Sequence, residues 1–282
     1  MSPATLDVDH LRSWIGRQEA TKERLEPELV RRFNATFDAD SNCIEDGSVA
    51  PRLIHFCLGH AAAPTASLGG DGHPQRGGFL PAIPLPRRMA AGGRLEFSGE
   101  LRVGDLVRRT SKVADLSVKE GRSGTLCFVA VDHVIDVDGQ VMVTERQDIV
   151  YREADTSSGQ VVEVRPCPQG QYDKLIRPTP TLLFRYSAIT FNSHRIHYDD
   201  RYAREIEGYP GRVVHGPMQA TLLLRLATEI KGSAPRQFAF RNQSPLFDNT
   251  DFHLHAENDG HKLRLWSARD GGPIAMTAEA SW

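Results

Sequence analysis

The stretch G-P-M-Q-A-T-L-L-L-R-L-A-T-E-I-K, from Gly216 to Lys231, has the length and composition of a helix. Apolar residues occupy it on most sides, and a helix that is apolar nearly all round belongs in a protein core. Strand-like segments follow it near 237–242, 252–257, 262–268 and 274–281. One buried helix followed by antiparallel strands predicts a sheet that wraps around the helix.

The first half of the chain carries a similar strand pattern. β-branched enrichment predicts strands over Leu95–Leu101, Lys112–Lys119, Ser123–Ile135 and Val141–Tyr151. Hairpin turns are expected at Glu120-Gly121 and Asp138-Gly139, and helices within 8–20 and 23–36. We therefore expect an α+β protein with two tandem antiparallel sheets, each wrapped around a central helix, which is a double hotdog.

A polar, turn-rich segment separates the two halves. We place a linker at 156–178, between an N-terminal hotdog at 1–155 and a C-terminal hotdog at 179–282. The second unit is expected to open with a strand at Thr181–Phe191. The Gly- and Pro-rich stretch from His60 to Gly93 is too long for a mere connector, and its apolar residues indicate that it packs against another part of the fold.

Composition and charge exclude several classes of function. The 282 residues are 40% hydrophobic and 25% charged with a net charge of −2, so bulk electrostatics give no support for nucleic-acid binding. No apolar run has the length of a membrane helix, and the first residues lack the pattern of a secretory signal. The four cysteines are far apart, which indicates reduced thiols. We expect a cytoplasmic protein that binds neither nucleic acid nor membrane.

Three polar residues, Asn192, His194 and His197, follow the strand predicted before them. About twenty residues later, His215-Gly216-Pro217 begins the long apolar helix. A strand end that presents imidazoles can supply acid–base chemistry, and the N–H groups of a helix N-terminus can hold a developing oxyanion. Together the two segments predict a catalytic site.

Segments in both halves resemble the MaoC-type hydratases and dehydratases of acyl thioesters. They are F-R-Y-S-A-I-T-F-N-S-H-R-I-H-Y-D (184–199), G-Y-P-G-R-V-V-H-G-P-M-Q-A-T-L-L (208–223), Leu68–Gly93 and E-R-Q-D-I-V-Y-R (145–152). Within that family the chain is similar to the tandem-hotdog branch, which includes 3-hydroxyacyl-thioester dehydratases, mesaconyl-C4-CoA hydratase and itaconyl-CoA hydratase. The resemblance implies an acyl-CoA hydro-lyase.

The family motif G-D-x-N-P-x-H-x-D falls on this chain with a departure. Its catalytic His matches His197, and its trailing Asp matches Asp199, which we expect to cap the next helix. Its catalytic Asp is replaced by Asn192, and its Asn by His194. An amide cannot act as a general base, so the two-residue mechanism is not carried over whole. The tandem branch itself has the form T-F-N-x-H-R-I-H-Y-D, which this chain shares.

Hydration of an unsaturated thioester needs an activated water, a held thioester oxygen and a proton for Cα. We expect His197 to transfer a proton and the Gly216 N–H to hold the oxygen. Asn192 orients the water or the carbonyl, unless it only caps a turn. His194 is a second proton carrier, unless it only orients Asn192 or bonds a backbone group. The thioester acidifies the α-proton, so we expect no metal and no cofactor beyond the coenzyme A of the substrate.

Mesaconyl and itaconyl groups carry a free carboxylate, so a site for them needs an arginine. Arg195, Arg87 and Arg88 are the candidates, although Arg87 and Arg88 can equally meet the phosphates of CoA or solvent. The first half lacks a counterpart of the loop that carries Asn192, His194 and His197, which we call the His loop. By analogy with the family, we expect it to be non-catalytic and to accommodate the acyl or pantetheine group.

The leading prediction is a hydratase that adds water reversibly to a short dicarboxylic enoyl-CoA, such as itaconyl-CoA or mesaconyl-C4-CoA. Two alternatives stay open: a 3-hydroxyacyl-thioester dehydratase of fatty-acid synthesis, and a non-catalytic acyl-thioester-binding protein, for which only Asn192 speaks. A thioesterase of this fold usually has a carboxylate on the central helix, where only Glu229 lies, near the far end. The chain is expected to act as a single-chain pseudo-dimer or as a homodimer.

Overall fold

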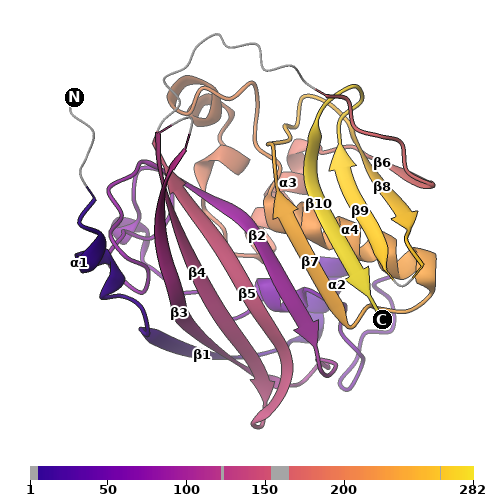
Figure 1. Cartoon of the computed structure of the whole chain (residues 1–282). Helices are drawn as coiled ribbons and strands as arrows, with labels where there is room; N and C mark the ends of the chain where they lie inside the picture. The colour runs from indigo at the N-terminus through magenta and orange to yellow at the C-terminus, as the bar shows by residue number, and fades with distance from the viewer. Residues whose placement is uncertain (1–5, 122–123, 154–164, 261) are drawn as a thin grey trace.

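Ten antiparallel strands form one continuous sheet in the computed structural model, which describes residues 6–121, 124–153, 165–260 and 262–282 (Figure 1). The first half contributes β1 (Gln18–Arg24), β2 (Arg87–Phe97), β3 (Leu106–Gly121), β4 (Gly124–Val137) and β5 (Gln140–Arg152). The second half contributes β6 (Tyr172–Ile176), β7 (Gln237–Asn242), β8 (Phe252–Asn258), β9 (Leu263–Ala268) and β10 (Ile274–Ser281). Both predicted strand sets are therefore present.

The strand order of the second half mirrors that of the first. Across the sheet the order is β1-β3-β4-β5-β2 and then β7-β10-β9-β8-β6, so that the first strand of each half lies at an outer edge and the second at the centre. Strands β2 and β7 pair with each other, with Leu95 opposite Phe238, and join the halves (Figure 1). Because this pairing is continuous, the two units share one sheet and one main core.

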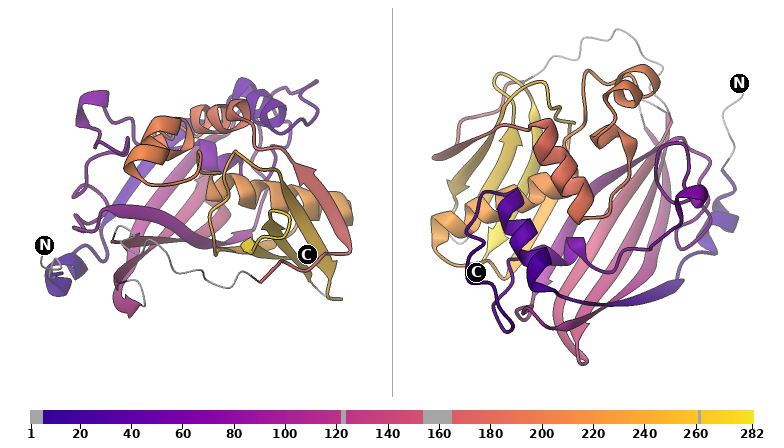
Figure 2. Two further views of the ribbon diagram at one scale, coloured as in Figure 1. Left: turned by 90° about the horizontal axis from the view of Figure 1, so that it is seen from above. Right: turned by 180° about the vertical axis from the view of Figure 1, so that it is seen from behind.

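The long helix α4 (Gly216–Lys231) has the bounds that the sequence predicts. It packs against β8, β9 and β10, and its own residues Met218, Leu223 and Ala227 are fully buried in that contact. Two further helices, α2 (Pro27–Thr36) and α3 (Pro180–Ile189), pack against each other on the same side of the sheet (Figure 2). These helices give the second half its central helix and a covering layer.

The first half has short turns where the second half has α4. Between α2 and β2, where all residues are described, the chain contains only the 3₁₀ turns η1 (Ile54–Cys57) and η2 (Thr65–Ser67) and a long loop. Ile83 and Leu85 of this loop pack with Leu11 of α1 (Val8–Arg12) in a second apolar cluster that includes Val129 and Tyr151 of the sheet. The Gly- and Pro-rich stretch therefore covers the first sheet, in agreement with the expectation that it packs.

The helix α3 (Pro180–Ile189) occupies most of the segment 181–191, so the strand predicted there was wrong. Thr179 caps α3, since its Oγ1 accepts a hydrogen bond from the Leu182 N–H at 3.2 Å, and Pro180 occupies the first helical position. The helix expected within 8–20 is shorter than predicted, since α1 ends at Arg12 and β1 begins at Gln18. Strand β6 falls inside the expected linker and pairs with β8 as an edge strand of the second half.

Candidate active site

His197 ends η3 (Arg195–His197), a 3₁₀ turn shortly after α3. Its Nδ1–H donates to the Val213 carbonyl at 2.7 Å, so the lone pair of the neutral ring lies on Nε2. Burial lowers the pKa of His197 to about 4, although the Val213 carbonyl acts in the opposite direction. His197 is therefore neutral at physiological pH and can accept a proton.

Four imidazoles form what we call the imidazole row. The ring centroids of His73 and His194 are 4.2 Å apart, those of His194 and His197 are 5.3 Å apart, and those of His197 and His215 are 3.7 Å apart. His215, fully buried, closes the row with its Nε2 at 2.8 Å from the Ser187 hydroxyl oxygen. Burial also lowers the pKa of His194, to about 2, with the help of its two neighbours in the row. The two central rings of the row, His194 and His197, are thus neutral at physiological pH.

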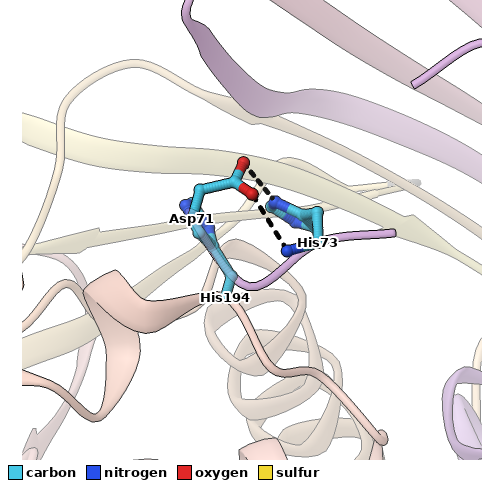
Figure 3. Close-up of side chains that lie close together, drawn as sticks. All are labelled: Asp71, His73 and His194. Atoms are coloured by element: carbon cyan, nitrogen blue, oxygen red, sulfur yellow. Dashed lines mark hydrogen bonds and ion pairs between the residues drawn. The ribbon is translucent and has the colours of Figure 1, made fainter. Parts of the chain in front are cut away.

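The first member of the row comes from the first half of the chain, which sequence reasoning missed. His73 lies in the Gly-rich loop, and its Nδ1 is 3.0 Å from Oδ2 of Asp71 (Figure 3). The other Asp71 oxygen accepts the His73 backbone N–H at 3.0 Å. One ligand atom from each of Asp71, His73 and His194 lies within 4.8 Å of the others. The only signal in the sequence was the polar pair within G-D-G-H-P.

Backbone contacts hold the Gly-rich loop against the loop of residues 192–197, the predicted catalytic loop. The Arg195 N–H donates to the Asp71 carbonyl at 2.9 Å, and the Ser193 hydroxyl donates to the Gly72 carbonyl. Gly72 has a φ of +90°, and a Cβ there would overlap the Ser193 carbonyl oxygen. Only glycine satisfies both the backbone conformation and the close approach. The loop therefore holds Asp71 and His73 in a fixed place beside His194.

The polar residues around His197 have mainly local partners. Oδ1 of Asn192 accepts the His194 N–H at 3.0 Å, which is the turn-capping arrangement. Asp199 caps the next turn, η4 (Tyr202–Ile206), because its Oδ1 accepts the Tyr202 N–H at 3.0 Å. Gly216 begins α4, and a Cβ there would lie 2.8 Å from the side-chain nitrogen of Asn242. Its N–H belongs to the first turn, whose donors have no partner within the helix.

A cavity of about 460 Å³ opens beside the row, between the Gly-rich loop and η4. His73, Asp71 and Arg88 line it from the first half, and Tyr202 and Ile206 line it from the second. A smaller cavity of about 160 Å³ lies over the first sheet. Arg88 lines both cavities. The site is therefore built from both halves of the chain.

The structure separates the three candidate arginines. Arg195 donates to the Asp199 carboxylate at 2.8 Å and to the Gly70 carbonyl at 3.0 Å. Arg87 donates to the Glu207 carbonyl at 2.7 Å and lies 3.4 Å from the Glu207 carboxylate. Arg88 has no hydrogen-bond or ion-pair partner among the residues that the structure describes, although it lines the cavity. Of the three, Arg88 is the one available to a ligand.

Comparison with known proteins gives the class. The family model for hydroxyacyl-thioester dehydratase type 2 matches residues 53–248. Mesaconyl-C4-CoA hydratase of Chloroflexus aurantiacus is 42% identical over 268 residues, which span 94% of this chain and 95% of that protein. The chain therefore belongs to the hydroxyacyl-thioester dehydratase type 2 family, and the prediction of a hydratase or dehydratase enzyme is confirmed.

Solved structures have the same fold. A MaoC-like dehydratase from Phytophthora capsici matches with a TM-score of 0.70 at 14% identity, covering 98% of this chain and 99% of that one. A Mycobacterium tuberculosis protein with a double hotdog fold matches with a TM-score of 0.56 at 14% identity, covering 95% and 96%. The predicted double hotdog is confirmed. No helix among the described residues is long and apolar enough to cross a bilayer.

Buried neutral histidines predict a loss of stability in mild acid. Burial lowers the pKa of His133 and of His197 to about 4, and of His194 to about 2. In the unfolded chain these groups take up protons below about pH 6.5, whereas in the folded chain they do not until far lower pH. The free energy of unfolding should therefore fall as the pH drops below 6.5, by about 1 kcal/mol for each histidine at about pH 5.5.

Urea unfolding followed by circular dichroism at pH 7.5 and 5.5 measures this loss. The triple variant His133→Gln/His194→Gln/His197→Gln provides the control, because it should lose less stability between the two pH values, the remainder coming from other buried histidines such as His215. Equal losses in both proteins would contradict the explanation.

Proposed function

We propose that this protein catalyses the reversible addition of water across the double bond of a short dicarboxylic enoyl-CoA of the mesaconyl-C4-CoA type. The observation that carries the proposal is Arg88, an arginine without an ionic partner among the described residues, in the cavity beside the imidazole row. The 42% identity to mesaconyl-C4-CoA hydratase supports the same substrate class.

His197 and Gly216 supply the central chemistry of the proposal. Nε2 of His197 takes a proton from water as the water oxygen bonds to Cβ, and the electrons of the double bond move onto the thioester oxygen. The Gly216 N–H donates to that oxygen, aided by the positive end of the α4 dipole. A proton donor then protonates Cα and gives the hydroxyacyl product. His197 suits the first step because it is neutral and carries its lone pair on Nε2.

Arg88 is the carboxylate anchor in this proposal. Its guanidinium can donate two parallel hydrogen bonds to the oxygens of a carboxylate, while Arg195 and Arg87 are already paired with Asp199 and Glu207. The first half of the chain thereby accommodates the far end of the acyl group, and the second half supplies the base and the oxyanion donor. Coenzyme A enters as part of the substrate.

Replacement of Arg88 by methionine is expected to lower kcat/KM for mesaconyl-C4-CoA by roughly 10- to 100-fold, because a charge-assisted hydrogen bond contributes about 1.5–3 kcal/mol. The kcat/KM for crotonyl-CoA, which has no carboxylate, should change little. Arg108→Met, at an exposed position on β3, is the matched control. Equal losses on both substrates would show that Arg88 does not read the carboxylate.

A chromatographic assay of the purified protein with mesaconyl-C4-CoA, itaconyl-CoA, crotonyl-CoA and 3-hydroxybutyryl-CoA tests the function. Preferred turnover of a dicarboxylic thioester supports the proposal. Preference for crotonyl-CoA and 3-hydroxybutyryl-CoA would overturn the substrate class and favour the dehydratase activity that the family name describes. Absence of turnover with every thioester, together with retained binding, would favour an acyl-thioester-binding protein.

A further inference from the structure

We propose that Asp71 and His73, both from the first half of the chain, form a second acid–base pair of this active site. In this assignment His73 is a catalytic residue that exchanges a proton with Cα, and Asp71 is the residue that positions it. The inference rests on the hydratase–dehydratase activity proposed above. It gives a chemical role to the half that lacks the His loop.

The hydrogen bonds between the two residues set the state of the imidazole. A carboxylate only accepts hydrogen bonds, so the 3.0 Å contact between Asp71 Oδ2 and His73 Nδ1 places the ring proton on Nδ1. Nε2 of His73 is then free to take or give a proton. Because Asp71 also accepts the backbone N–H of His73, the pair is held as one unit.

The position of His73 suits contact with a substrate. Of the four rings in the imidazole row, only His73 lines the cavity of about 460 Å³, where Arg88 is also found. The His73 side chain retains 20% of its solvent exposure, while His197 retains 8% and His215 is fully buried. An acyl group anchored at Arg88 therefore lies next to His73.

Asp71 also supplies the carboxylate that the catalytic loop lacks. The family motif has an Asp where this chain has Asn192, whose side-chain oxygen accepts the His194 N–H. Asp199 is paired with Arg195 and caps η4. Asp71, in contrast, lies in the group of ligand atoms within 4.8 Å that includes His194. The carboxylate beside the row thus comes from a loop about 120 residues upstream of the catalytic one.

A second group of this kind gives a proton balance in which each imidazole transfers one proton. His197 gains one proton from water as the C–O bond forms, and His73, as imidazolium, gives one proton to Cα as the enolate collapses. The product has then gained the elements of one water molecule. Proton exchange with solvent then removes the proton from His197 and restores the one that His73 gave. In the dehydration direction each transfer runs in reverse.

The charges around His73 link this chemistry to the carboxylate of the substrate. Burial lowers the pKa of His73, the hydrogen bond to Asp71 raises it, and the positive charge of Arg88 lowers it again. A carboxylate bound to Arg88 offsets that positive charge. Binding of a dicarboxylic substrate therefore raises the pKa of His73 and favours the imidazolium that the reaction needs.

The test compares His73→Gln, Asp71→Asn and His253→Gln on whichever thioester the unchanged protein converts. His253 is the matched control, because it forms another Asp–His contact, with Asp173 at 2.6 Å, outside the site. We expect His73→Gln to lower kcat by roughly 10²- to 10⁴-fold with little change in KM, and His253→Gln to leave both unchanged. Asp71→Asn keeps the shape of the side chain and removes its charge, and it should lower kcat by roughly 10-fold or more.

A pH profile separates positioning by Asp71 from a merely structural role. Loss of the carboxylate lowers the pKa of His73, so the limb of the kcat profile that reports the protonated His73 should move to lower pH in Asp71→Asn. An NMR titration of the histidine rings gives the same answer without any substrate. We expect the pKa of His73 to fall in Asp71→Asn.

The outcomes distinguish this inference from the proposed function. A preference for crotonyl-CoA overturns the proposed dicarboxylic substrate class. The role of His73 is then tested by the kcat of the same variants on crotonyl-CoA. Retention of kcat within about threefold in His73→Gln overturns the acid–base pair. Activity that is lost on chelation and restored by Zn²⁺ also overturns it, because Asp71, His73 and His194 would then be metal ligands. If no thioester is converted, an unchanged His73 pKa in the NMR titration of Asp71→Asn overturns the pairing itself.

Discussion

Replacement of His197 by asparagine is expected to lower kcat by roughly 10²- to 10⁴-fold, the range for loss of a general acid–base group. The amide nitrogen of asparagine can still donate to the Val213 carbonyl, as Nδ1 does at 2.7 Å, so the turn should remain folded. Only the basic Nε2 is removed. Two measurements test this. Single-turnover hydration of the preferred thioester reports the chemical step, and steady-state rates give kcat and KM.

The design of this variant separates chemistry from folding. Far-UV circular dichroism and the thermal midpoint should stay close to those of the unchanged protein. A kcat within about threefold of the original would assign the base to another ring of the row. A rise in KM of the same size, with kcat unchanged, would instead show that His197 acts in substrate binding.

The second large effect is expected on stability, at the buried contact between His55 and Glu145. The side chains are 2% and 4% exposed, and Nε2 of His55 lies 3.4 Å from Oε2 of Glu145. Burial raises the pKa of Glu145, yet its interactions with His55, His133 and Arg109 outweigh burial and lower that pKa to about 2. The core of the first half therefore contains an ionised carboxylate that depends on its partners.

Glu145→Ala should lower the free energy of unfolding by about 3–5 kcal/mol, because it leaves the polar partners of the carboxylate buried without it. Scanning calorimetry would detect a fall of roughly 10 °C in the unfolding midpoint. Glu96→Ala, at an exposed position on the neighbouring strand β2, should have little effect. The double variant His55→Phe/Glu145→Leu should recover most of the loss. A loss below about 1 kcal/mol in Glu145→Ala would contradict the importance of the pair.

The sequence predicted those elements whose side chains have a regular apolar pattern. The helix at 216–231 and most strands of both halves are of this kind. An element that buries one face needs apolar residues at regular spacing, and this spacing is visible in the sequence. Strand β1 escaped prediction because it is a polar edge strand, exposed at six of its seven residues. The segment 181–191 misled, since its aromatic and β-branched residues favour a strand. The capping Thr179 and the following Pro180 were the available signals for a helix.

The candidate site was only half visible in the sequence. Asn192, His194, His197 and Gly216 share one continuous region, which a motif can register. Asp71 and His73 lie far upstream, and no periodicity connects them with His194. Their proximity arises from the docking of one backbone on another, at Gly72 and Ser193. The choice among three arginines likewise depended on ion pairs that only the folded chain contains.

The pairing of β2 with β7 has a consequence for the evolution of this protein. It makes the molecule equivalent to a heterodimer whose two subunits are encoded, translated and degraded together at a ratio of one to one. The second unit contains the central helix, and the first supplies a wall of the cavity. Because the two units always occur together, neither needs to contain every part of the site. Neither unit can be exchanged for a relative on its own, because the contacts that complete the site cross the seam.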